Sequence, residues 1–295
     1  MPIEIAAHAG FCMGVRRAVE SAVQVADSGV PSCTLGELIH NPTVVDMLRQ
    51  RGIPPVASAE EAAGRQVLIR SHGVAPEVIR QLEKAGCKVV DLTCPFVNKL
   101  HRVVAEDTSE DCPLIMVGER EHPEVKGTCG WARGKVYVVA TAEEAAQLPE
   151  MEQAAAAVQT TFPPERWEAI VAVLRGRVQH LKEHNTICNA TAVRQREAKK
   201  LAAASDAMIV VGGRTSANTH KLFEACKALC PRTILVECAA EIPPAFANIH
   251  SDKIGITAGA STPDGSLEEV ATHMTDNENM AQSSDFTMDA IVATM

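Results

Sequence analysis

The chain has 295 residues, of which 46% are hydrophobic and 22% are charged, as in an ordinary globular protein. Its formal net charge of -9 argues against nonspecific nucleic-acid binding, which needs a basic surface. No apolar run reaches the roughly 18 residues of a membrane span, and no basic segment precedes an apolar stretch at the N-terminus. We therefore expect a cytoplasmic protein that binds neither nucleic acid nor membrane.

Short apolar, β-branched runs alternate along the chain with segments of helical spacing. This alternation predicts an α/β protein with parallel sheets. Gly, Ser, His and Pro gather just after several runs, at the carboxyl edge where such sheets bind ligands. The expected strands are Val67–Ile69, Val89–Leu92, Leu114–Val117, Val136–Val139, Met208–Val211, Ile234–Val236 and Ile254–Ile256, and the expected helices include Ala75–Ala85, Ala192–Ala204 and Asn218–Leu229.

Three cysteines, Cys12, Cys94 and Cys188, each stand where a strand-like run becomes helix-like. A cysteine just before a helix lies at the positive end of the helix dipole, which favours a metal-binding thiolate. One thiolate from each third of the chain predicts a metal centre shared by three lobes. Three ligands on a cubane iron–sulfur cluster would leave one iron open to a substrate. The predicted lobes are residues 1–93, 94–186 and 187–274, followed by a polar tail over 275–295 that has no Lys or Arg.

The chain has ten cysteines and no visible secretion signal, so they are expected to be reduced thiols and metal ligands, not disulfides. Cys226 and Cys230 lie one helical turn apart, with Cys238 near, and could form half of a zinc site. No compact second pair accompanies them. The cysteines expected to be small core residues are Cys33, Cys87, Cys112, Cys129, Cys226, Cys230 and Cys238.

Three histidines, His40, His72 and His122, stand in Gly- or Pro-marked loops between an apolar run and a segment of helical pattern. Each taken alone is typical of a capping or surface residue. Their matching contexts also suit an anion site aided by helix N-termini, or a metal site such as zinc.

Two loops rich in hydroxyl groups follow apolar strands and open helices. They are residues 212–219, which include Ser216 and Asn218, and residues 259–264, which include Ser261. Both are typical N-cap sequences, and the same groups suit phosphate oxygens. Neither has the glycine spacing of a P-loop or a dinucleotide fingerprint.

Glu124 follows His122-Pro123, and Thr160 follows an apolar Ala/Val run. A single Glu is usually a solvated surface residue. A Glu beside a buried cluster could instead donate protons, because burial raises a carboxyl pKa. Thr160 alone would be a hydroxyl at a strand end.

Together these motifs resemble the 4-hydroxy-3-methylbut-2-enyl diphosphate reductase family, also called the LytB family, from Ile3 to about Met274. Order, spacing and local context all agree. The motifs are Gly-Phe-Cys12-Met-Gly-Val-Arg-Arg-Ala, His40-Asn-Pro, Ser71-His72-Gly, Thr-Cys94-Pro, Glu-His122-Pro-Glu124-Val-Lys-Gly-Thr, Gln-Thr160-Thr, Ile-Cys188-Asn-Ala-Thr191, Ser216-Ala-Asn218-Thr and Ala-Gly-Ala-Ser261-Thr-Pro-Asp.

The resemblance implies a cloverleaf of three pseudo-repeated α/β lobes around one [4Fe–4S] cluster. It implies that Cys12, Cys94 and Cys188 are the cluster ligands. It further implies that Glu124 supplies protons with Thr160 and that Thr191 lines the pocket. The residues implied to hold the diphosphate are His40, His72, Ser216, Asn218 and Ser261, with His122 near both the diphosphate and the reacting carbons.

The implied reaction is a reductive dehydroxylation that gives isopentenyl and dimethylallyl diphosphate, the last step of the non-mevalonate isoprenoid pathway. Electrons would arrive singly from ferredoxin or flavodoxin. One departure is Ala217, where some members have a second serine, and the tail exceeds the minimal family length. Two alternatives stay open: a three-cysteine cluster dehydratase resembling quinolinate synthase, and a zinc-stabilised binding module.

Overall fold

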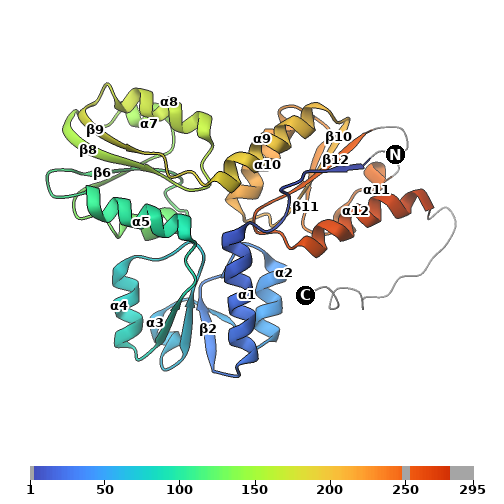
Figure 1. Ribbon diagram of the computed structural model, residues 1–295, viewed down its shortest axis with the longest axis horizontal. Coiled ribbons are helices and arrows are strands. Elements are labelled where there is room, and N and C mark those ends of the chain that lie inside the picture. Colours follow the sequence, from blue (N-terminus) through green and yellow to red (C-terminus); the bar gives the residue numbers. More distant parts are fainter. Residues whose placement is uncertain (1–2, 248–252, 280–295) are drawn as a thin grey trace. The chain divides into compact units, whose positions relative to one another are not determined.

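The strands form three four-stranded sheets, and all the strand pairs in them are parallel. The computed structural model describes residues 3–247 and 253–279 (Figure 1). Parallel neighbours need crossover connections, and helices supply most of them here. The α/β class expected from the alternating pattern is therefore confirmed.

The first sheet has the strand order β3-β2-β4-β5. One of its faces buries Val67 and Ile69 of β4 in a cluster with Leu82 of α4. Alternate strand residues share a face, so one apolar strand can serve two layers of helices. The strands are β2 (Ser32–Leu35), β3 (Pro55–Val56), β4 (Gln66–Ile69) and β5 (Lys88–Asp91), and the helices in this part of the chain are α1 (Met13–Asp27), α2 (Pro42–Gln50), α3 (Ala59–Ala62) and α4 (Pro76–Lys84).

The second sheet has the order β7-β6-β8-β9 and is covered by helices on both faces. Ile115 and Val117 of β6 pack in a cluster with Trp167 of α8, whereas Leu114 and Met116 pack toward α5 and α6. The strands are β6 (Leu114–Val117), β7 (Val136–Val139), β8 (Met151–Val158) and β9 (Val178–His184), and the helices are α5 (Pro95–Asp107), α6 (Pro123–Cys129), α7 (Ala142–Ala146) and α8 (Pro164–Leu174).

The third sheet has the order β1-β12-β10-β11. Ile209 and Val211 of β10 pack in a cluster with Met274 of α12, and the alternate residues Met208 and Val210 pack in one with helices α9 and α10. The strands are β1 (Ile3–Ile5), β10 (Ala207–Val211), β11 (Thr233–Val236) and β12 (Ile254–Ala258), and the helical segments are α9 (Asn189–Ala203), α10 (Ala217–Lys227), the 3₁₀ turn η1 (Ala239–Glu241), α11 (Pro244–Ala247) and α12 (Asp264–Asn279).

The chain divides into two compact units. The larger unit holds the first and second sheets and comprises Met13–Ile39 and Thr43–Ala192. The smaller unit holds the third sheet and comprises, among the described residues, those of Met1–Cys12, His40–Pro42 and Val193–Met295.

The first strand, β1, differs from the expected lobe plan. It pairs with β12 in the third sheet, although the first predicted lobe covers residues 1–93. Strands that follow one another in sequence are neighbours in only about two-thirds of cases, so position in the chain does not fix the sheet of a strand. The boundaries near residues 93 and 186 stay a prediction.

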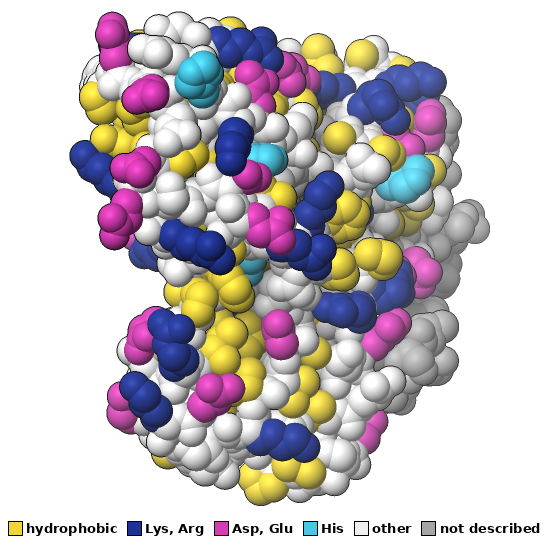
Figure 2. All heavy atoms as spheres, turned by 60° about the vertical axis from the view of Figure 1, so that its left-hand side comes forward, with side chains coloured by type: hydrophobic (Ala, Val, Ile, Leu, Met, Phe, Trp, Pro, Cys, Tyr) yellow, Lys and Arg dark blue, Asp and Glu magenta, His cyan; other side chains and the backbone are white. Residues whose placement is uncertain are grey.

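All seven predicted strands are present, with ends shifted by at most a few residues. Helix α12 continues to Asn279, past the start of the predicted tail at residue 275, and residues 280–295 lie outside the described part of the chain. No helix among the described residues has both the length and the apolarity needed to cross a membrane. On the face shown in Figure 2, acidic and basic side chains lie interspersed.

Candidate active site

The predicted site residues of the larger unit lie just beyond the carboxyl ends of its parallel strands. His72 follows β4, Cys94 follows β5, and Thr160 follows β8. Glu124 lies in the first turn of α6, the helix that follows β6. Because parallel strands end at the same edge of a sheet, separate sequence motifs converge there.

Cys94 is the N-cap residue of α5, and Pro95 occupies the first helical position, where its fixed φ suits a helix start. The Cys94 N–H donates a hydrogen bond to the Ser71 carbonyl (3.0 Å). The Arg17 guanidinium donates to the Thr93 carbonyl (2.6 Å) and so ties α1 to the loop that holds the cysteine. The thiol therefore lies at the positive end of the α5 dipole on a backbone fixed from two sides.

Helix α1 approaches Cys94 through Gly14. A methyl group on Gly14 would lie 2.5 Å from the Cys94 Sγ and 3.3 Å from its Cβ. Such a contact is far shorter than van der Waals distance, so an alanine here would displace the helix or the Cys94 side chain. The sequence analysis quoted Gly14 within a motif but assigned it no role.

Cys188 lies directly before α9. Its N–H donates to the Thr160 carbonyl (2.9 Å), and its own carbonyl accepts from the N–H of Thr191 (3.0 Å). Thr191 is buried. The loop that carries Cys188 is thereby joined to the loop that carries Thr160.

Glu124 is only 2% exposed, so the interpretation of a solvated surface residue is wrong. Its Oε1 accepts from the Thr160 N–H (2.6 Å), and its Oε2 pairs with the Thr160 hydroxyl (2.8 Å). Two hydrogen bonds from one residue fix both carboxyl oxygens. This is the positioning that a proton-transfer group needs.

His122 caps the helix that carries Glu124. Its Nδ1 accepts from the Glu124 N–H (3.2 Å). The ring also meets His72 edge to face, with the centroids 5.5 Å apart and the planes at 83°. The capping interpretation of His122 is therefore confirmed, and the two predicted histidines of the larger unit lie together.

In the smaller unit, Ser216 caps α10 by accepting from the Thr219 N–H (3.3 Å). The Ser261 hydroxyl lies within hydrogen-bonding distance (3.4 Å) of both the His40 carbonyl and the Ser216 hydroxyl. Asn218, in the first turn of the same helix, is buried, and its Nδ2 has no hydrogen-bond partner among residues 3–247 and 253–279. Two hydroxyl groups thus meet at the N-terminus of the helix whose first turn carries Asn218, and a helix N-terminus stabilises an anion.

Cys12 belongs to this smaller unit, and its N–H donates to the Ala260 carbonyl (3.1 Å). The Arg194 guanidinium donates to the Gly10 carbonyl (2.8 Å), two residues before the cysteine. The first contact attaches the Cys12 loop to the loop that carries Ser261, and the second attaches it to α9.

No disulfide joins any of the ten cysteines. Burial raises the pKa of the Cys226 thiol to about 12 and that of Cys129 to about 11. Zinc binds thiolates, and Cys226 and Cys230 pack instead in the core around α9 and α10. The zinc half-site is therefore not supported.

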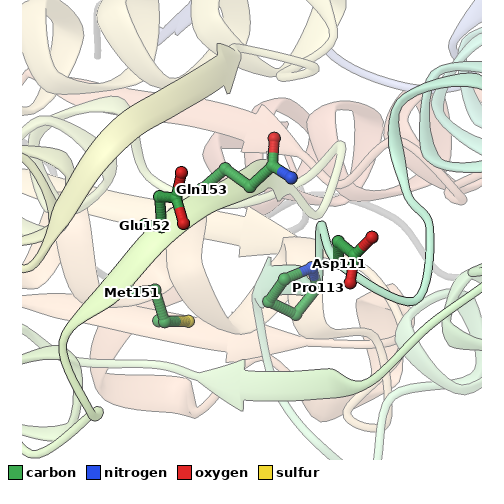
Figure 3. A pocket seen from close by; sticks show the side chains of 5 residues that line it. All are labelled: Asp111, Pro113, Met151, Glu152 and Gln153. Carbon is green, nitrogen blue, oxygen red and sulfur yellow. The ribbon is translucent and has the colours of Figure 1, made fainter.

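A cavity of about 400 Å³ lies at the other end of the second sheet, near Pro113 before β6 and Met151 at the start of β8 (Figure 3). It is further lined by Asp111, Glu152 and Gln153. None of these residues was predicted to be functional.

The model of the LytB protein family matches residues 3–275. The chain is 44% identical over 271 residues to 4-hydroxy-3-methylbut-2-enyl diphosphate reductase of Geobacter sp. (strain M21), covering 92% of this chain and 95% of that relative. It is 42% identical over 277 residues to the reductase of Aquifex aeolicus (strain VF5), with the same coverage.

Two solved structures of such reductases are similar. The structure described as the terminal enzyme of the non-mevalonate pathway has a TM-score of 0.70 and 41% identity, covering 94% of this chain and all of that one. The Plasmodium falciparum reductase has a TM-score of 0.86 and 25% identity, covering 92% of this chain and 87% of that one. The chain therefore belongs to the LytB family of 4-hydroxy-3-methylbut-2-enyl diphosphate reductases.

Proposed function

We propose that this protein reduces 4-hydroxy-3-methylbut-2-enyl diphosphate to isopentenyl and dimethylallyl diphosphate. The observation that carries the proposal is the buried Glu124 carboxyl, held by Thr160 beside two histidines, in a chain of this family. The reaction consumes two electrons and two protons, breaks the allylic C–O bond and releases water. The family match favours this reductive reaction over the dehydratase and zinc-module alternatives.

The proposed ligands of a [4Fe–4S] cluster are Cys12, Cys94 and Cys188, one from each predicted lobe. The donor set fits the cluster because Fe–S clusters bind thiolates, none of the three is in a disulfide, and Cys94 and Cys188 both lie at helix starts. When bound, the cluster supplies single electrons and a Lewis-acidic iron. Gly14 keeps the space that the Cys94 thiol needs.

The proposed diphosphate ligands include Ser216, Asn218 and Ser261 at the start of α10, with His40 on the adjoining segment. The buried Asn218 Nδ2, which lacks a partner within the described residues, supports this assignment because a buried donor is costly unless an acceptor meets it. His72 and His122 would add donors. Their contacts with a remote part of the substrate would orient its allylic end.

Glu124 is the proposed proton donor. Its carboxyl would protonate the leaving hydroxyl, so that water departs, and a second proton would reach either end of the allyl group. Protonation at one end gives isopentenyl diphosphate and at the other end dimethylallyl diphosphate. The Thr160 hydroxyl supports this role because it keeps the carboxyl oriented at 2.8 Å.

Ferredoxin or flavodoxin is the proposed electron donor, because the reaction takes electrons one at a time. A cytoplasmic location is also proposed. Ten cysteines without a disulfide support it, since reduced thiols persist in reducing compartments.

The decisive experiment is an anaerobic assay of reconstituted protein with the proposed substrate and a strong one-electron reductant. Wild-type protein should form both C5 diphosphates. Glu124→Gln should bind substrate but lose turnover by roughly 10²- to 10⁴-fold, the usual contribution of a general acid. The matched control is Glu121→Gln, three residues earlier, where the side chain is 82% exposed and pairs with Lys126. Normal turnover by Glu124→Gln would remove Glu124 from the proton path.

A further inference from the structure

The turn between β4 and α4, which carries His72, is packed against α5 and α6 by residues that the proposed reaction does not use. The Trp131 Nε1–H, just beyond α6, donates to the Val74 carbonyl (3.0 Å). The Trp131 ring stacks on His101 of α5, with the centroids 5.0 Å apart and the planes at 19°. The indole thus holds the backbone two residues after His72 by a hydrogen bond, and the buried His101 ring packs on the indole.

The turn is closely packed on both sides. Gly73 has a φ of +69°, which favours glycine, and a methyl group there would lie 2.5 Å from the His101 Cε1. On the opposite side, a methyl group on Gly127 of α6 would lie 3.2 Å from the Gly73 oxygen. Close-packed groups transmit displacement, so moving either side would move the turn.

The same turn is joined to the other site residues. Its Ser71 carbonyl accepts from the Cys94 N–H (3.0 Å), and its His72 ring meets the His122 ring. Helix α6, which presses on the turn through Gly127, also carries Glu124 in its first turn. The position of His72 relative to Glu124 is therefore set by the packing between this turn and α6.

We propose that His101 and Trp131 form a clamp on the turn that carries His72. The clamp keeps His72 at a fixed position relative to His122 and Glu124, and so positions the substrate diphosphate. They are positioning residues, because each acts through the turn and neither is assigned to the substrate. The proposal rests on the proposed function, since it assumes that His72 binds the diphosphate.

The two residues of the clamp are uncharged and are buried or half-buried. His101 is 3% exposed, and burial lowers its pKa to about 4, although Asp91 partly opposes the shift. The ring is neutral near pH 7, so it stacks on the indole without burying a charge. Trp131 is half-buried, and its N–H is the donor that fastens the turn.

The test compares two tryptophan substitutions in the anaerobic holoenzyme. Trp131→Phe keeps a ring for His101 but removes the donor to Val74. Trp167→Phe alters the other tryptophan, which is buried in the core of the second sheet and belongs to a different cluster. The readouts are kcat, KM, thermal midpoint and the equilibrium Kd of inorganic diphosphate.

Trp131→Phe is expected to raise KM and the diphosphate Kd by roughly tenfold while kcat changes less than about threefold, as for a loss of uniform binding. Trp167→Phe should lower the thermal midpoint but leave both constants within about twofold. Gly127→Ala, which presses on the turn from the other side, should reproduce the rise and replaces Trp131→Phe if that variant does not fold.

Equal KM and Kd values in Trp131→Phe, Gly127→Ala and wild type would overturn the clamp and leave it a structural contact only. Failure of the proposed function looks different. In that case wild-type protein would bind inorganic diphosphate without reducing the substrate, and the two Kd comparisons would still decide the clamp.

Discussion

The two ends of the parallel strands in the larger unit carry similar residue types in opposite environments. At the carboxyl ends, Glu124 is buried and both of its oxygens are bonded to Thr160. At the amino ends of the second sheet, Asp111 and Glu152 line an open cavity and are exposed (Figure 3). A carboxylate in water has its ordinary chemistry, whereas a buried and oriented one can serve catalysis.

Close packing also constrains the carboxyl ends, although it is not confined to them, because a methyl group on Gly134, just before β7, would collide with the Ser109 carbonyl. At the carboxyl side, a methyl group would lie 2.5 Å from a neighbouring side chain at Gly14 and at Gly73, and 3.2 Å from backbone atoms at Gly127. Side chains that cannot move hold a reacting group in one geometry. The comparison therefore predicts that small changes at the carboxyl ends have large effects and that charge changes at the amino ends have small ones.

The largest effect is expected from Gly14→Ala. The added methyl group would collide with the Cys94 Sγ, so the thiol or α1 must shift. We expect reconstituted protein to lose most of its iron and labile sulfide, and turnover to fall by roughly 100-fold, as for loss of a supporting group at a metal site. Iron and sulfide analysis with the anaerobic assay measures both.

Gly86→Ala is the control, because a methyl group there would meet no atom within 4 Å. The φ of +74° at Gly86 favours glycine, so this variant is expected to lose some folding stability without crowding a cysteine. Full cluster content in Gly14→Ala would show that the contact with Cys94 is not limiting.

A smaller effect is expected from Thr160→Val. This change removes the hydroxyl beside the Glu124 Oε2 but keeps the backbone N–H that bonds Oε1. We expect kcat to fall by about tenfold with little change in KM, because one of two orienting hydrogen bonds is lost. Thr160→Ser should restore most of the rate. Equal kcat in the valine and wild-type proteins would show that the hydroxyl does not support Glu124.

Stability should depend on pH through His101. Burial lowers its folded-state pKa from 6.5 to about 4. Between pH 6.5 and pH 4, His101 is therefore protonated in the unfolded chain but neutral in the folded chain. Above pH 6.5 the neutral His101 does not reduce the free energy of unfolding. At pH 5 the free energy of unfolding is lower by about 2 kcal/mol, and the loss is complete as pH falls through 4. Anaerobic thermal midpoints at pH 7 and pH 5 measure it.

His101→Phe keeps the stack on Trp131 and removes the titrating group, so its thermal midpoint should fall less between the two pH values. An equal fall in both proteins would assign the acid sensitivity to other groups.

The smallest effect is expected from Asp111→Asn combined with Glu152→Gln. Both side chains are exposed at the amino ends of the second sheet, where substitutions usually change stability by less than about 0.5 kcal/mol. Turnover and thermal midpoint should match wild type. A clear loss of turnover would give the cavity of Figure 3 a role and break the contrast between the two ends.

Much of the fold follows from local sequence. Runs such as Leu114–Val117 and Met208–Val211 are buried β-branched or apolar segments, and they are strands as predicted. The strand Met151–Val158 was not among the expected strands, although Thr160 after it was interpreted as a strand-end hydroxyl, because its four central alanines favour helices by intrinsic propensity. It is a strand because small side chains fit between helices that pack on both faces of the sheet.

The sequence by itself determined the α/β class, the strand-to-helix junctions that carry the cysteines and histidines, and the family. Those features depend on residue order and spacing, which act over a few residues at a time. Only the tertiary structure decided that β1 joins the third sheet, that Gly14 faces the Cys94 thiol and that His101 and Trp131 grip the His72 turn. These contacts join residues far apart in the chain, and their identity follows from packing, which no local pattern records.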